Sequence, residues 1–139
     1  MTNKQKTSKT MNIILWTAQI LLAISLIWAA AMKLFQSPEK LAEMWPWTAD
    51  NIKLVKFTAT LDLLAGLGLI LPAFFQIPKM TVYAAYGIIL LMIAASIFHI
   101  TRGEASLIGI NIFFAFLAAF IAWGRQKKAP LSKESHSQQ

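Results

Sequence analysis

Four long apolar stretches constrain the fold of this chain more than any other feature of its sequence. They run roughly over residues 12–35, 52–71, 79–100 and 105–123. A bilayer core of about 30 Å is crossed by about 20 apolar residues in a helix, so each stretch is long enough to span a membrane. The connections 73–78 and 101–104 are short, which makes the spans they join antiparallel. We therefore expect an all-α fold, an integral membrane antiparallel four-helix bundle.

The composition favours a membrane location and excludes several classes of site. Hydrophobic residues make up 57% of the 139 residues and charged residues 14%, against about 25% charged in soluble domains. A soluble fold of this size could not bury so much apolar surface. The sequence has no cysteine, which excludes disulfides and thiolate metal sites. It carries no nucleotide-loop, zinc or haem-ligating motif, and we expect no metal.

The net charge of +7 reflects membrane topology rather than a nucleic-acid partner. Residues 1–11 and 126–139 are polar tails around a membrane domain of residues 12–125. With four spans, the tails and the 73–78 connection share a side with eight basic residues: Lys4, Lys6, Lys9, Lys79, Arg125, Lys127, Lys128 and Lys133. The other side holds five, namely Lys33, Lys40, Lys53, Lys56 and Arg102. Because basic residues favour the cytoplasmic side, we expect both tails in the cytoplasm.

The connection between the first two spans predicts a short interfacial helix. Ser37 or Pro38 can start this helix, and it carries Leu41, Trp45 and Trp47 on one side. Aromatic rings of this kind settle at the level of the lipid headgroups. Residues 36–51 therefore either anchor the outer face of the bundle or act as a lid that gates a substrate.

Asp62 is the most informative polar residue. It lies near the middle of the second span, where ionisable groups are costly and usually face the bundle interior. Thr58 and Gly66 lie four residues to either side, so the three share one helical face. Lys33 lies near the outer end of the first span, and two arrangements are open for it. Its ammonium either snorkels to the outer headgroups or turns inward and pairs with Asp62.

A second polar group surrounds the connection between the third and fourth spans. His99 ends the third span, and Arg102 and Glu104 follow it. Asn111 lies seven residues after Glu104, so the two side chains point the same way. We expect one cluster at the outer mouth of the bundle, above Asp62 and Asn111, that is formed by His99, Arg102, Glu104, Lys33, Lys53 and Lys56. The cluster is either a structural ion-pair cap or a polar binding pocket open to the outer side.

The same residues carry a resemblance to a known family. The first span ends in Ala-Met-Lys33-Leu, the second reads Leu61-Asp62-Leu-Leu-Ala-Gly66-Leu-Gly68, and the third closes with His99-Ile-Thr-Arg102-Gly103-Glu104. Over about residues 12–125 the chain resembles the DoxX-like family of small four-helix membrane proteins. The resemblance implies a bacterial inner (cytoplasmic) membrane location. At the position of Asp62 the family more often has Glu, whose carboxylate reaches further.

Three functions are compatible with these observations. The first is a non-catalytic membrane subunit or small-molecule-binding protein with a polar pocket near the outer face. The second is the quinone-facing subunit of a membrane oxidoreductase complex, because the resemblance includes relatives associated with thiosulfate:quinone oxidoreductases. The third is a small proton-coupled transporter that uses Asp62 and works as a homo-oligomer. The candidate pocket residues are Lys33, Thr58, Asp62, His99, Arg102, Glu104 and Asn111.

The abundance of aromatic residues bears on the quinone alternative. Five tryptophans and nine phenylalanines could line a quinone pocket, but lipid-facing and interfacial positions explain them as well. The lipid bilayer is the one partner that the sequence requires. Redox partner proteins belong to the second function, and we expect no catalysis by the chain alone.

Overall fold

The computed structural model describes residues 2–131, and this part of the chain is helical with no strand. Four long helices account for most of it: α1 (Asn3–Phe35), α3 (Ile52–Phe74), α4 (Lys79–Thr101) and α5 (Gly109–Lys127). Short elements fill two of the connections: α2 (Pro38–Met44), the 3-10 helix η1 (Pro46–Asp50) and the 3-10 helix η2 (Ala105–Leu107). The predicted all-α fold is confirmed.

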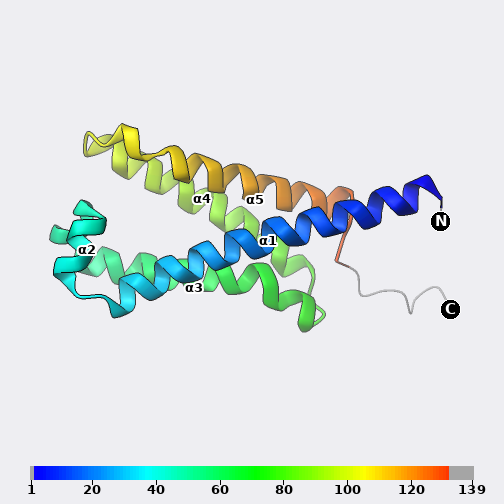
Figure 1. Cartoon of the computed structure of the whole chain (residues 1–139), viewed down its shortest axis with the longest axis horizontal. Helices are drawn as coiled ribbons and strands as arrows, with labels where there is room; N and C mark the ends of the chain where they lie inside the picture. The colour runs from blue at the N-terminus through cyan, green and yellow to red at the C-terminus, as the bar shows by residue number, and fades with distance from the viewer. Residues whose placement is uncertain (1, 132–139) are drawn as a thin grey trace.

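The four long helices form an antiparallel bundle (Figure 1). α1 packs against α3 and α5, and α4 packs against α3 and α5, so every helix has two antiparallel neighbours. We call the end with α2, η1 and the α4–α5 connection the loop end. The opposite end, where α1 begins and α5 finishes, is the tail end (Figure 1). The two ends carry different polar groups, and these are described separately below.

The distribution of apolar side chains is that of a membrane protein. Leu15, Leu22, Leu69, Ile88 and Ile121 are completely buried between the helices. Many large apolar side chains nevertheless face outward along the helix lengths, including Leu90, Phe116 and Phe74, which are 69%, 71% and 73% exposed. α1, α3, α4 and α5 are each long and apolar enough to cross a bilayer. The chain is therefore a multi-pass membrane protein, with its outer apolar surface in lipid.

The helix boundaries differ from the predicted spans by more than one residue in four places, one of which is the end of α5 at Lys127 rather than at residue 123. α1 begins at Asn3 because Thr2 and Gln5 form a capping box: the Thr2 hydroxyl accepts from the Gln5 amide and the Gln5 side chain accepts from the Thr2 amide. The predicted N-terminal tail is thus largely helical. α3 continues through Pro72 to Phe74, and α5 starts only at Gly109 because residues 105–107 form η2. The part of the predicted C-terminal tail that follows Leu131 lies outside the described residues.

The predicted interfacial helix is present as α2. The Ser37 hydroxyl caps it by accepting from the Lys40 amide at 3.3 Å, and Pro38 occupies the first turn, where its missing N–H has no cost. Leu41 is buried, and the Trp45 ring packs edge-on against Trp28 at 6.0 Å between centroids. α2 is thereby held against the loop end of the bundle, and η1 follows it directly.

Candidate functional site

An ion pair between α1 and α3 is the centre of the loop-end site. Lys33 Nζ lies 2.7 Å from Asp62 Oδ2 and 3.2 Å from Thr58 Oγ1. The side chains of Lys33 and Asp62 are only 11% and 7% exposed. Of the two arrangements left open for Lys33, the inward pairing is therefore confirmed, and snorkelling to the headgroups is wrong. A buried cation with a carboxylate at hydrogen-bond distance avoids the cost of an uncompensated charge.

The local sequence explains how the two helices reach each other here. Thr58 and Asp62 are one turn apart on α3, and the Thr58 hydroxyl donates to the Val55 carbonyl at 3.1 Å, which leaves its lone pair facing Lys33. One turn further along α3 lies Gly66. A Cβ on Gly66 would lie 2.8 Å from Ile27 Cγ1 of α1. The small residue permits the close approach that the salt bridge requires.

A second charged group occupies the α4–α5 connection. Glu104 accepts a hydrogen bond from Arg102 Nε at 2.8 Å, and its other carboxylate oxygen lies 2.8 Å from His99 Nδ1. The end of α4 creates this arrangement. The Glu104 amide donates to the His99 carbonyl and the Gly103 amide to the Ile100 carbonyl, the pattern of a Schellman cap. Gly103 has the positive φ of 77° that this cap demands.

The electrostatics of Glu104 follow from these contacts. Its hydrogen bonds with His99 and then with Arg102 hold the pKa of the Glu104 carboxyl below its ordinary value. Both hydrogen bonds favour the ionised carboxylate. Glu104 is therefore an anion at neutral pH, and the connection is an ion-pair cluster rather than a set of independent surface charges.

Two aromatic rings lie between the ion pair and the Glu104 cluster. Lys33 Nζ lies 5.6 Å from the centre of the Trp47 ring, and that ring packs edge-on against Phe98 at 5.7 Å. Phe98 in turn lies 5.5 Å from the guanidinium carbon of Arg102. Cations at such distances are attracted to aromatic faces. The two charged groups thus belong to one continuous surface with an aromatic centre, contributed by α1, η1, α3 and α4.

Not every predicted residue joins this surface. Lys53 and Lys56 are exposed on α3, so the prediction that they converge with the cluster is wrong; their positions in the helix turn them away from Lys33. Within residues 2–131 no hydrogen bond or ion pair joins the Glu104 cluster to Asp62. Asn111 has a buried side-chain amide nitrogen without a hydrogen-bond partner in this part of the chain.

The tail end holds a buried charge that the sequence reasoning missed. Arg125, in the last turn of α5, is 3% exposed. Its Nε donates to Gln19 Oε1 at 2.5 Å, and its Nη1 donates to Asn12 Oδ1 at 2.6 Å and to the Ala129 carbonyl at 2.9 Å. The sequence places Arg125 at the last position of the predicted membrane domain, after the last apolar stretch, and counts it only among the basic residues that favour the cytoplasmic side. Its helical spacing from Ala118 and Ala122, both buried, was the signal that could have placed it in the core.

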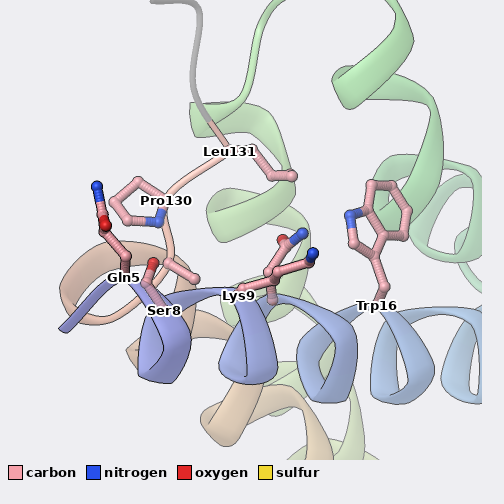
Figure 2. A pocket seen from close by; sticks show the side chains of 8 residues that line it. Gln5, Ser8, Lys9, Trp16, Pro130 and Leu131 are labelled. Carbon is pink, nitrogen blue, oxygen red and sulfur yellow. The ribbon is translucent and has the colours of Figure 1, made fainter. Parts of the chain in front are cut away.

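A groove lies at the same end (Figure 2). It has a volume of about 460 Å³ and is lined by residues 129–131 and, from α1, by Gln5, Ser8, Lys9, Asn12 and Trp16. None of the predicted pocket residues lines it. Among the described residues there is no group of three or more His, Asp or Glu side chains that could hold a metal ion.

Comparison with known proteins gives one finding. The family model described as the DoxX-like family matches residues 17–121. This range includes all seven residues predicted for the pocket, whereas Arg125 and the lining of the tail-end groove lie outside it. No curated protein and no solved structure is significantly similar to the chain.

Proposed function

Since this chain belongs to the DoxX-like family, we propose that it is a non-catalytic membrane subunit or small-molecule-binding protein whose site is the loop-end surface. The observation that supports this most directly is the Lys33–Asp62 pair beneath Trp47. An ion pair kept only for stability is often no better than apolar residues of the same size. Ionisable groups within membrane spans are usually functional for that reason.

The geometry favours a ligand with a hydrogen-bond acceptor and a flat apolar part. A lysine ammonium has three donors, and the contacts with Asp62 and Thr58 use two of them. The third is free for a carbonyl or similar acceptor. Trp47 and Phe98 offer ring surfaces beside it for stacking or edge-on contact. The Lys33 side chain retains 11% exposure, so it is not sealed off from a ligand at the loop end.

The proposed location is the bacterial inner membrane, with both chain ends in the cytoplasm and the loop end outside. The excess of basic residues at the tail end supports this orientation. A reporter that works only in the cytoplasm should be active when fused after Gln139 and silent when inserted after Ala49, in η1. The reverse pattern would show that the loop end faces the cytoplasm.

Binding at the loop end is tested by purification in mild detergent, followed by mass spectrometry of the bound small molecules. Lys33→Met combined with Asp62→Asn removes both charges of the pair without leaving one uncompensated. We expect a molecule that copurifies with the wild type to be absent from this double variant. Lys56→Gln, an exposed position on α3 away from the surface, is the matched control and should retain the molecule. Identical ligand content in all three proteins would reject the loop-end site.

The edge-on contact between Trp47 and Phe98 favours one alternative, the quinone-facing subunit of a membrane oxidoreductase complex. A quinone head group has both a flat ring and carbonyl acceptors for Lys33. In that case the copurified molecule is a quinone, and a partner protein with a flavin or iron–sulfur centre accompanies it. Proton-driven uptake into liposomes that is lost in Asp62→Asn would instead support the small proton-coupled transporter.

A further inference from the structure

Within residues 2–131, no carboxylate pairs with the charge of Arg125 at the tail end. Its three hydrogen-bond partners, Gln19, Asn12 and the Ala129 carbonyl, are neutral, and its Nη2 is buried with no partner among the described residues. The acidic residues of the described chain are all elsewhere: Glu39, Glu43, Asp50, Asp62 and Glu104. A guanidinium in such surroundings favours an external anion, and its planar donors suit phosphate in particular.

The groove of Figure 2 lies directly beside this charge. Three of the residues that line it also contact Arg125: Asn12 and Ala129 through hydrogen bonds, and Trp16 through its ring, 5.4 Å from the guanidinium carbon. Lys9 adds a second positive charge on the groove wall itself. None of the described residues that line the groove carries a carboxylate. The groove therefore has a positive wall, with the polar side chains of Gln5 and Ser8 available for hydrogen bonds.

The position of the groove along α1 identifies the kind of anion. Asn12 is the last polar residue before the apolar run that starts at Ile13, and α1 continues beyond it toward Asn3. The groove thus straddles the junction between the lipid-facing and polar parts of the helix, the level of the headgroups. Trp16, further along α1 toward the apolar run, gives the deeper side of the groove an apolar surface, and Leu131 adds a second apolar side chain to its lining. Phospholipid headgroups are the phosphates that reach this level, and their glycerol and acyl carbons match that surface.

We propose that this groove binds the phosphate of an anionic phospholipid from the leaflet that faces the tail end. Lys9 and Asn12 contact the phosphate, and Arg125 stabilises it from behind the wall. This site is independent of the loop-end surface and lies outside residues 17–121, the range of the family match. A lipid bound in the groove would fix how deeply α1 and α5 lie in the bilayer, which a general attraction of basic residues to the membrane surface would not do.

The test is a titration of the full-length protein in detergent, in which the melting temperature is measured against added lipid at about 0.3 M salt to screen unspecific attraction. We expect phosphatidylglycerol to raise the melting temperature in a saturable way, whereas phosphatidylcholine and inorganic phosphate do not. Lys9→Gln should weaken the apparent affinity about five-fold. Lys6→Gln removes an exposed charge from the same helix outside the groove and should change it less than about two-fold.

Four results would overturn the proposal. Equal losses in Lys6→Gln and Lys9→Gln would mean unspecific attraction to the surface. Equal stabilisation by phosphatidylcholine would show that the groove does not require an anionic headgroup. Equal stabilisation by inorganic phosphate would show that the groove binds free anions rather than a lipid. Finally, if the Glu134→Gln variant binds the lipid and the wild type does not, the groove of the wild type is occupied by the Glu134 carboxylate instead of a lipid.

Discussion

The two ends of the bundle each hold a cation shielded from solvent, largely buried in the case of Lys33 and fully buried in the case of Arg125, and they stabilise it by different means. At the loop end, Lys33 lies 2.7 Å from the carboxylate of Asp62 on the neighbouring helix. At the tail end, the guanidinium of Arg125 is hydrogen-bonded to the side chains of Gln19 and Asn12 and to a carbonyl, all of them neutral. The first cation is compensated by one opposite charge and the second by several dipoles.

This difference has consequences for what each end can do. An ion pair depends on a single partner, so a ligand or proton that acts on Asp62 changes the state of Lys33 at once. A cation surrounded by dipoles keeps its positive charge whatever one neighbour does, and it remains attractive to an external anion. We therefore associate the loop end with a ligand that competes for hydrogen bonds, and the tail end with a permanent anionic partner. The two ends should respond differently to the loss of one partner.

The largest effect is expected from Asp62→Asn. This change leaves the Lys33 ammonium buried without an opposite charge, and we expect a loss of about 3 kcal/mol in the free energy of unfolding. Adding Lys33→Met should restore more than half of that loss, because no unpaired charge then remains. Thermal unfolding of the four proteins in detergent gives the coupling energy directly. A coupling indistinguishable from zero would show that the pair does not hold α1 against α3.

A smaller effect is expected at the tail end from Gln19→Leu. The change removes the acceptor for Arg125 Nε and also the donor to the Leu69 carbonyl, with an expected loss of about 2 kcal/mol in unfolding free energy. Adding Arg125→Met should restore little of it, because Asn12 and the Ala129 carbonyl then lose their donor as well. The same thermal measurements apply. If Arg125→Met restored as large a share of the lost unfolding free energy as Lys33→Met does at the loop end, the two ends would not differ in how they stabilise their cation.

The contrast also explains how much the sequence could predict. The four helices follow from the length of the apolar stretches, and the inward position of Asp62 follows from its depth in one of them. The partner of Asp62 remained open because Lys33 lies near a helix end, where snorkelling and pairing are both compatible with the sequence. The choice depends on how closely α1 approaches α3. That distance is set by packing at positions such as Gly66, a three-dimensional property that hydropathy does not report.

For Lys33 the sequence left two arrangements open, whereas for Arg125 it indicated a single one, which was wrong. Charged residues just after an apolar stretch usually lie in solvent, so its position does not predict a buried side chain. Its polar contacts in the interior come from α1, whose Asn12 and Gln19 accept hydrogen bonds from the guanidinium at the end of α5. Both partners lie more than 100 residues before Arg125 in the chain. Contacts of this range are not encoded in any local pattern.

A third prediction concerns the geometry of the Glu104 cluster. Gly103→Ala places a Cβ at a φ of 77°, and we expect a loss of about 1 kcal/mol in unfolding free energy. Gly103→Asn should lose less, since Asn tolerates this backbone region. Gly87→Ala, within α4 and with no heavy atom near the added Cβ, is the matched control and should be neutral or stabilising. Equal effects of Ala at both positions would contradict the requirement for a positive φ.

The smallest effect is expected from the pH dependence of Glu104. Hydrogen bonds from His99 and then Arg102 lower the pKa of the folded carboxyl below its ordinary value of 4.5, which the unfolded chain retains. A lowered folded pKa means that the stabilisation is complete above the unfolded pKa and is lost as the pH falls through the folded pKa. The difference in melting temperature between wild type and Glu104→Gln should therefore be constant just above pH 4.5 and shrink below it.

This difference isolates Glu104 from the other carboxyl groups, because those groups are the same in both proteins. It also tests the loop end as a unit. Glu104 is anchored by groups that lie next to Phe98 and hence next to Trp47 and Lys33, so its protonation should loosen the aromatic centre as well as the α4–α5 connection. If the wild type releases its ligand over the same acid pH range and Glu104→Gln does not, the Glu104 cluster and the Lys33–Asp62 pair are coupled. A melting-temperature difference that grows as the pH falls has the wrong sign for a lowered pKa and would exclude this account of the cluster.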